Sequence, residues 1–207
     1  MMNKINIYLF DKVDSLDGGF INKNLHRLPM LRQQQCIKYR NIINKNACII
    51  AYLLLEKGLK EQYGIVEPIA FIYNEYGKPY LKDYPHIFFN ISHCKCGVIC
   101  AIADFEIGID IQDIQPFNID IVRRVCCENE LRQLSESDNP ARLFCEIWTK
   151  KESYAKAKGI SVADILKHDL PDTGYFKREY KDYNISLFGN NYFKENDVNI
   201  IYCESTI

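Results

Sequence analysis

The stretch FEIGIDIQDI, residues 105–114, decides the fold of this chain. Its alternation predicts a β-strand with isoleucines on one face and with Gly108, Asp110 and Gln112 on the other. A carboxylate at the centre of a strand needs a partner, which can be a cation, a basic side chain or a set of backbone donors. A glycine beside it indicates the close approach of a ligand or of another backbone. The rest of the sequence has to supply both partners.

Length and composition limit the class of protein. The chain has 207 residues, 47% of them hydrophobic, and a net charge of −1. We therefore expect a folded globular protein of one domain or two small ones, with no broad affinity for nucleic acid or for a membrane. The longest apolar runs, such as ACIIAYLLL at residues 47–55, are far shorter than the roughly 20 residues that a membrane span needs. The first residues do not resemble a signal peptide, so we expect a cytoplasmic protein.

The order of expected elements indicates two halves, residues 1–103 and 104–207. Residues 11–30 are expected to form a loop with a short helix, and residues 74–79 a turn. Helical patterns cover residues 31–60 (one long helix or two), 119–127, a segment from about Asn129, and 141–158 with Gly159 as its C-cap. Strand patterns cover residues 5–10, 69–73, 86–92, 98–103, 183–188 and 199–203. Each half begins with a strand, continues with helices and ends in strands, which indicates an internal duplication with a ligand cleft between the halves.

Nine cysteines raise the question of a disulfide framework or a zinc site. An odd number of cysteines without an export signal favours reduced thiols. His93, Cys94, Cys96 and Cys100 have the character of zinc ligands, but no second half-site follows at the usual spacing. Cys100 also lies within an apolar strand, so small core residues are the preferred interpretation, with zinc as the alternative.

The helix expected over residues 141–158 carries the second group of polar side chains. Trp148, Glu152 and Lys156 recur every four residues and therefore share one helical face, with Lys151 adjoining it. This pattern alone also fits an ordinary exposed helix with a Glu–Lys pair. Together, however, Asp110 and Glu152 offer two carboxylates for Mg²⁺, while Lys151 and Lys156 offer positive charge to phosphates. The predicted chemistry is displacement at a phosphoryl group.

Four motifs occur in order along the chain. They are YGKPY at residues 76–80, NISH at 90–93, GIDI at 108–111 and WTKKESYAK at 148–156. Together they resemble the signature set of the Sfp-type (Gsp/Sfp/HetI/AcpT) 4′-phosphopantetheinyl transferases. The resemblance implies a pseudo-dimer of two similar α+β halves, with the active site in the cleft between them. It also implies an enzyme that transfers the 4′-phosphopantetheine arm of coenzyme A to a serine of an apo acyl or peptidyl carrier protein, with Mg²⁺ on the pyrophosphate.

The resemblance also implies a role for each matching residue. Asp110 and Glu152 would hold Mg²⁺, Lys156 would contact the pyrophosphate and take part in catalysis, and Lys151 would add positive charge. Lys78, Ser92 and His93 would bind the phosphates of coenzyme A, with His93 on the 3′-phosphate. Either Glu130 or Glu152 would act as the general base for the carrier serine.

Two positions depart from the family pattern. Gln112 stands where a third acidic metal ligand is expected, so we expect weaker metal binding, with Gln112 ligating directly or through water. Ala47 stands where the family often has an arginine for the 3′-phosphate, and Lys38, Arg40 or Lys45 would have to compensate. For an acidic carrier helix, the basic candidates of the second half are Lys158, Lys167, Lys177, Arg178 and Lys181.

Two other classes of protein compete with this interpretation. A non-catalytic module that binds coenzyme A or a carrier would account for Gln112 and for the missing arginine. A metal-dependent phosphohydrolase would need an activated water and more carboxylate or histidine ligands than the two placed acids and the four histidines of the chain supply.

Overall fold

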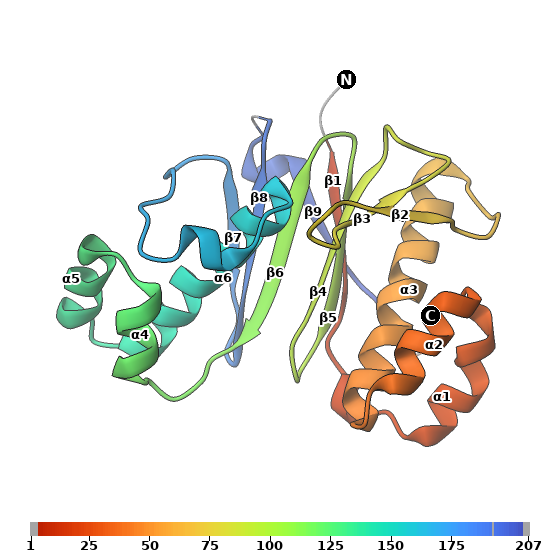
Figure 1. The fold of residues 1–207 in the computed structure, drawn as a ribbon, viewed down its shortest axis with the longest axis horizontal. Coiled ribbons are helices and arrows are strands. Elements are labelled where there is room, and N and C mark those ends of the chain that lie inside the picture. Colours follow the sequence, from red (N-terminus) through yellow and green to blue (C-terminus); the bar gives the residue numbers. More distant parts are fainter. Residues whose placement is uncertain (1–3, 192, 205–207) are drawn as a thin grey trace.

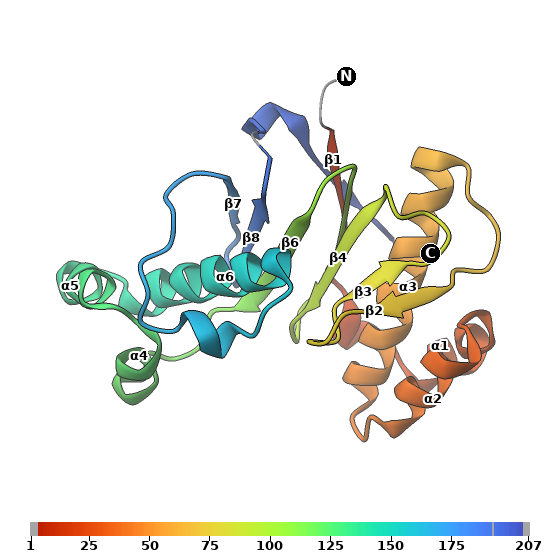
Figure 2. The same cartoon turned by 45° about the horizontal axis from the view of Figure 1, so that its top comes forward.

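The computed structural model describes residues 4–191 and 193–204 and has a mixed α+β architecture, as predicted. Helices lie on two sides of a central region of strands (Figure 1). The helices α1, α2 and α3 lie on one side and α4, α5 and α6 on the other, while strands of both halves of the chain meet in the middle (Figures 1 and 2). None of the helices in the described ranges is both long and apolar enough to cross a membrane.

The elements of the first half alternate between strands and helices. Its helices are α1 (Gly18–Asn24), α2 (Met30–Lys38) and α3 (Ile42–Tyr63). Its strands are β1 (Ile5–Phe10), β2 (Phe71–Tyr73), β3 (Pro79–Leu81), β4 (Phe88–His93) and β5 (Val98–Ala103). Short 3₁₀ turns cover Val13–Ser15 and Leu25–Arg27.

The second half begins with β6, the strand predicted from residues 105–114. Its strands are β6 (Ile107–Asp113), β7 (Tyr175–Glu179), β8 (Tyr183–Gly189) and β9 (Val198–Tyr202). Its helices are α4 (Ile119–Val125), α5 (Glu128–Glu136) and α6 (Pro140–Lys158), and 3₁₀ turns cover Val162–Ile165 and Glu195–Asp197.

The strands form two main sheets and one small hairpin. The first sheet has the order β4-β5-β1-β9, the second has the order β6-β8-β7, and β2 pairs with β3. In each half, the first strand pairs antiparallel with the second strand of a later hairpin, as β1 with β5 and β6 with β8. The exception is β9, which comes from the second half but pairs parallel with β1 of the first.

Alternation along the strands creates the separate cores. Ile107, Ile109 and Ile111 of β6 face a cluster that also contains Ile5 and Ile7 of β1, so the two sheets share an apolar interior. The opposite face of the first sheet packs on α3. The opposite face of β6 packs on α6. The third core cluster joins α4, α5 and α6.

Gly108 allows α6 to lie directly on β6. A Cβ at this position would fall 2.1 Å from the carbonyl oxygen of Ser153 and 2.3 Å from the backbone nitrogen of Ala157. The sequence predicted that a ligand or another backbone would approach Gly108 closely, and the structure shows that this neighbour is the backbone of α6. The contact sets the distance between Asp110 and the helix.

Most expected elements are present, with shifted ends. The helical segment at residues 31–60 is two helices, because Tyr39 is extended and the Asn41 side chain caps α3 by accepting from the Ile43 amide at 2.8 Å. Gly159 ends α6 with a φ of 64°, as predicted. The expected strands at 69–73 and 86–92 are β2 and β4, each starting two residues later. Two strands were not predicted, β3 and β7.

Candidate active site

Asp110 lies at the centre of the candidate site and is 4% exposed. One of its oxygens, Oδ1, accepts a hydrogen bond from Ser92 Oγ at 2.6 Å and an ion-paired hydrogen bond from Lys156 Nζ at 2.6 Å. Lys156 Nζ also donates to Ser92 Oγ at 3.0 Å. Ser92 comes from β4, Asp110 from β6 and Lys156 from α6, so this triangle joins the two halves of the chain.

The second oxygen of Asp110 is a buried acceptor without a donor. Oδ2 is shielded from solvent and has no hydrogen-bond partner among the described residues. A carboxylate oxygen in this position is costly to bury unless a cation or donor occupies the space beside it. The carboxylate therefore fits a metal ion or another cation on its Oδ2 side.

Glu152 lies one helical turn before Lys156 and faces the same region. Burial raises the pKa of its carboxyl group, the Lys156 ammonium opposes this effect, and the negative charge of Asp110 adds to it. Two acidic groups that disfavour each other's charge are a suitable pair for a divalent cation, which removes the repulsion. The structure thus brings Asp110, Glu152 and Lys156 together, as the sequence predicted.

Gln112 follows Asp110 on the same face of β6 and is half-buried. It lines an apolar pocket of about 260 Å³ together with Phe144 and Trp148 of α6 and Ile121 of α4. Its position two residues after Asp110 keeps its amide on the side of α6, where the resemblance places a metal ligand.

His93 lies at the end of β4 and lines a second pocket of about 230 Å³. Burial lowers the pKa of its imidazole and the Lys156 cation lowers it further, while Asp110 acts in the opposite direction. Ala47, the position of the missing arginine, lines the same pocket. The pocket lining contains a cation that the sequence did not single out, Arg32.

Arg32 lies on α2 with its guanidinium over the ring of Phe71, at 5.2 Å from the ring centroid. Its Nε is buried and has no hydrogen-bond partner in the part of the chain that the structure describes. Arg32 therefore lines this pocket together with Ala47 and His93, whereas Lys38, Arg40 and Lys45, the three cations proposed from the sequence, are not among its lining residues.

Lys151 and Glu130 are not part of this group. Lys151 is fully buried, and its Nζ donates to Glu130 Oε1 at 3.0 Å and to the carbonyl oxygen of His168 at 2.9 Å. Glu130 Oε2 accepts from the Cys127 amide at 2.9 Å and so caps α5. The two residues predicted as a phosphate contact and a general base are instead paired with each other between α5 and α6.

The ammonium group of Lys78 also donates its hydrogen bonds to residues outside the candidate site. Lys78 is 8% exposed, and its Nζ donates to Glu106 Oε2 at 2.5 Å and to the carbonyl oxygen of Ala157 at 3.1 Å. The sequence placed it among the phosphate ligands, whereas the structure engages its ammonium at the ends of β6 and α6.

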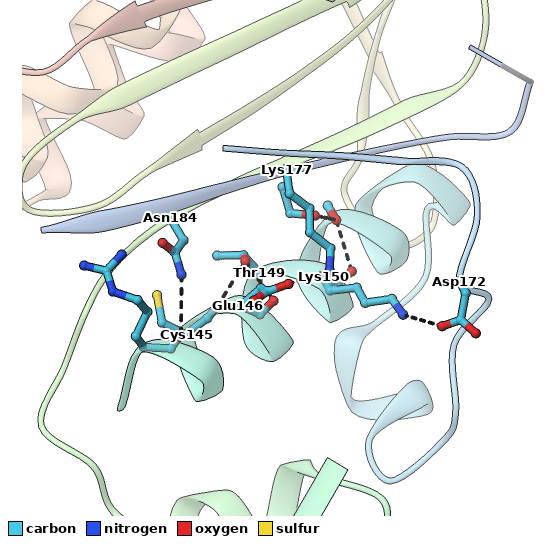
Figure 3. A network of polar contacts seen from close by, with 10 residues as sticks. Cys145, Glu146, Thr149, Lys150, Asp172, Lys177 and Asn184 are labelled. Atoms are coloured by element: carbon cyan, nitrogen blue, oxygen red, sulfur yellow. Dashed lines mark hydrogen bonds and ion pairs between the residues drawn. The ribbon is translucent and has the colours of Figure 1, made fainter. Parts of the chain in front are cut away.

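Other residues of α6 form a separate polar network with β7, β8 and the segment before β7 (Figure 3). Lys177 of β7 reaches Glu146 at 2.5 Å, and Lys150 reaches Asp172 at 3.5 Å. Other basic candidates for carrier recognition also have local partners: Lys158 donates to Asn190, and Arg178 pairs with Glu195. These contacts stabilise the sheet and helix around them.

The cysteines at 94 and 100 lie in different places. Cys94 belongs to the core between the sheets, and Cys100 belongs to the core under α3. Within the described ranges, no group of three or more histidine, cysteine, aspartate or glutamate side chains could hold a metal ion. The core interpretation of these cysteines therefore agrees with the structure better than the zinc alternative does.

The site as a whole consists of two acids, an amide, a hydroxyl and lysine at a junction of two sheets, beside a pocket with arginine and histidine. Such a donor set is typical of enzymes that bind a phosphate compound with a divalent cation. Comparison with known proteins shows to which family of enzymes the chain is similar. A profile described as the 4′-phosphopantetheinyl transferase superfamily matches residues 106–199.

Individual relatives extend the match to most of the chain. A 4′-phosphopantetheinyl transferase of Bacillus subtilis is 30% identical over 195 residues, which cover 91% of this chain and 87% of the relative. A second relative, 4′-phosphopantetheinyl transferase gsp of Aneurinibacillus migulanus, is 34% identical over 162 residues, or 77% of this chain and 66% of the relative. The Sfp protein of Bacillus subtilis strain 168 is 28% identical over 159 residues, or 75% and 68%.

The chain belongs to the 4′-phosphopantetheinyl transferase superfamily and is of the Sfp type. It is an enzyme that transfers the phosphopantetheine group to carrier proteins. The alternatives of a non-catalytic module and of an unrelated phosphohydrolase are set aside by this membership.

Proposed function

We propose that the enzyme takes its 4′-phosphopantetheine arm from coenzyme A, with Mg²⁺, and that Asp110, Glu152 and Lys156 form the reaction centre. The observation that carries this proposal is the buried, unpartnered Oδ2 of Asp110 beside a second acid and a lysine. In the reaction, a bond forms between the serine oxygen of the carrier and the phosphorus that bears the pantetheine. The pyrophosphate bond breaks, and adenosine 3′,5′-bisphosphate leaves.

The oxygen-bearing side chains around Asp110 suit Mg²⁺. Asp110 and Glu152 would ligate it with carboxylate oxygens and Gln112 with its amide oxygen or through water, because Mg²⁺ prefers oxygen ligands and keeps several waters. When bound, the cation would neutralise charge on the pyrophosphate. The neutral Gln112 makes the site less negative than three acids would, so we expect weaker metal binding.

The lysine and the phosphate pocket have distinct tasks. Lys156 already contacts Ser92 and Asp110, so its ammonium is placed to hold a pyrophosphate oxygen and to stabilise the negative leaving group. His93 and Arg32 would bind the 3′-phosphate, since both line the pocket at Ala47 and the Arg32 Nε still has a donor available.

Of the two glutamates considered as general base, Glu152 has the better support. It lies close to Asp110 and Lys156, where the carrier serine has to react, and a carboxylate oxygen that does not ligate the metal would accept the serine proton. Both oxygens of Glu130 are engaged, one by Lys151 and one by the Cys127 amide. We assign Glu130 to the support of α6 and not to proton transfer.

The apolar pocket beside Gln112 supports the approach of a carrier from that side. Phe117, Ile119 and Ile121 near α4 are 39%, 45% and 49% exposed. Arg123 and Arg124 follow on the same helix. Apolar and basic side chains together suit an acyl or peptidyl carrier that presents an acidic helix around its serine.

We further propose that residues 1–103 and 104–207 are the two halves of a pseudo-dimer, with the active site in the cleft between them. The matching order of β1-β5-β4 and β6-β8-β7 supports this, as does the packing of one long helix on each sheet, α3 and α6. β9 pairs with β1 across this division, so we expect the halves to fold together rather than separately.

Calorimetry tests the roles of coenzyme A and Mg²⁺ without turnover. We expect coenzyme A to bind the wild type more tightly with Mg²⁺ than with excess chelator, and Asp110→Asn to lose this difference. Equal affinity with and without Mg²⁺ in the wild type would contradict the metal assignment.

A further inference from the structure

The turn of the β2–β3 hairpin reaches across to the second half of the molecule. Lys78, which begins its return to β3, is buried, and its ammonium has three acceptors. They are Glu106 Oε2 at 2.5 Å, the carbonyl oxygen of Ala157 at 3.1 Å and that of Ile107 at 3.5 Å. These three acceptors match the three protons of an ammonium group, so Lys78 has no donor left for a nucleotide phosphate.

The acceptor at Ala157 is one of the last carbonyls of α6. A helix leaves its final carbonyl oxygens without partners inside the helix. The Gly159 amide donates a hydrogen bond to the carbonyl oxygen of Lys156 at 3.3 Å, and the Ile160 amide donates one to that of Ala155 at 3.1 Å. The carbonyl oxygen of Ala157 accepts a hydrogen bond from the Lys78 ammonium, which also places a positive charge at the negative end of the helix dipole.

The residue that ends α6 is held by the same hairpin. Asn74 Nδ2 donates to the carbonyl oxygen of Gly159 at 3.0 Å, and Asn74 Oδ1 accepts from the Lys78 amide at 2.8 Å. A Cβ at Gly159 would fall 2.8 Å from Asn74 Nδ2, so the contact is close. The ring of Tyr80 covers the Lys78 ammonium at 5.4 Å and completes the contact from β3.

We propose that Asn74 and Lys78, with Glu106 as counter-ion, form a clamp that positions the last turn of α6. This inference rests on the proposed function, because the clamped turn carries Lys156, which directly precedes Ala157, and because Glu152 lies one turn earlier. Lys78 is then a positioning residue. It acts on the reaction through the place of Lys156 beside Ser92 and Asp110, and it does not bind coenzyme A.

Two variants separate a clamp from a phosphate ligand. Lys78→Met keeps the length of the side chain and removes its charge, and Glu106→Gln keeps the size of the counter-ion and removes its charge. Lys82→Met is the matched control, because Lys82 is exposed directly after β3. For each protein we would measure kcat for carrier modification, the calorimetric Kd for coenzyme A, and hydrogen exchange of the Gly159 and Ile160 amides.

For Lys78→Met, we expect kcat to fall by about tenfold or more and the two amides to exchange about tenfold faster. The Kd for coenzyme A should rise by clearly less than about tenfold, since Lys78 itself makes no phosphate contact and binding is affected only through the displaced Lys156. Glu106→Gln should change kcat and exchange in the same direction by a smaller factor, and Lys82→Met should match the wild type.

The proposal is overturned if Lys78→Met weakens coenzyme A binding by about tenfold while kcat and amide exchange stay unchanged, which would indicate a phosphate ligand. It is also overturned if Glu106→Gln behaves as the wild type in all three measurements. A wild type that modifies no carrier would contradict the proposed function instead. In that case, the hydrogen exchange of the Gly159 and Ile160 amides would by itself test whether the clamp exists.

Discussion

Asp110 is held from one side only. Ser92 and Lys156 both donate to Oδ1, while Oδ2 is buried and has no protein donor among the described residues. At the scale of one residue, this asymmetry supports the proposal of a cation beside Oδ2. A purely structural Asp–Lys pair would be expected to have donors on both oxygens.

The first prediction concerns the charge of Asp110. Asp110→Asn keeps the size of the side chain but removes the charge opposite Lys156 and the proposed metal ligand. We expect kcat for carrier modification to fall by about a hundredfold or more. Glu146→Gln is the matched control on α6, because Glu146 pairs with Lys177 of β7, away from Asp110, and should keep full activity. Equal activity of the two variants would refute the site.

The second prediction concerns His93 and pH. Its pKa lies below the ordinary value of about 6.5, so the free imidazole is neutral near pH 8 and gains charge only as the pH falls. A protonated His93 attracts the 3′-phosphate, and the advantage of the wild type over His93→Gln in coenzyme A affinity should therefore grow from about pH 8 to about pH 6. Calorimetry at several pH values measures this ratio.

Two comparisons control that experiment. The phosphate itself gains a proton in the same range, and His93→Gln retains this effect, so the ratio isolates the imidazole. With 3′-dephospho-coenzyme A, the ratio should not depend on pH. A constant ratio for coenzyme A itself would exclude His93 from the 3′-phosphate.

At the scale of elements, α6 is the part on which the site depends. One face supplies Glu152 and Lys156, another packs on β6 at Gly108, and a third pairs Lys151 with Glu130 of α5. Each of these contacts fixes the helix in a different direction, so small changes at distant positions should move Glu152 and Lys156, the side chains proposed for catalysis.

The third prediction tests the contact of α6 with β6. In Gly108→Ala, the new methyl group would meet the backbone at Ser153 and Ala157, which cannot move aside as a side chain can. We expect a loss of about 1–3 kcal/mol in the free energy of unfolding, together with a loss of activity. Gly18→Ala is the control, because nothing lies within 4 Å of a Cβ there. Urea denaturation of Gly108→Ala and Gly18→Ala measures the free energy of unfolding of each variant.

The fourth prediction concerns the buried pair of α5 and α6. Lys151→Met removes the ion-pair partner of Glu130, whose side chain is only 14% exposed, and we expect a loss of about 3 kcal/mol in the free energy of unfolding. Glu130→Gln should retain a large part of the activity of the folded enzyme, because Glu130 supports the helix in this account. A folded Glu130→Gln protein without any transfer would restore Glu130 as the general base.

At the scale of the whole molecule, the sequence predicted local features well. The alternation of residues 105–114, the four-residue spacing on α6 and the cap at Gly159 all follow from the periods of strands and helices. β7 was missed because its sequence, YFKRE, is rich in charge and mostly exposed at a sheet edge, and β3 because it has only three residues, beginning with proline. The pairing of β9 with β1 joins residues almost 200 positions apart, which no local pattern can indicate.

The same limit applies to the site. The sequence proposed Asp110, Glu152 and Lys156, because motif and period agree on them, and the structure brings these three side chains together. It assigned Lys78 and Lys151 to phosphates, since a lysine beside a motif gives no sign of which acceptor it reaches. Lys151 directly precedes Glu152, yet the rotation of about 100° between the two residues turns Lys151 towards α5. Arg32 was not identified, because its pocket forms only when α2, α3 and β4 meet.

The most direct test of the central claim is the intact mass of a carrier. An apo acyl or peptidyl carrier would be incubated with the wild-type enzyme and coenzyme A, with Mg²⁺ and in parallel with excess chelator. We predict a carrier heavier by one phosphopantetheine with Mg²⁺, and little or no gain with the chelator or with Asp110→Asn. An unchanged mass for several acyl and peptidyl carriers with folded enzyme, or an equal gain without Mg²⁺, would contradict the account.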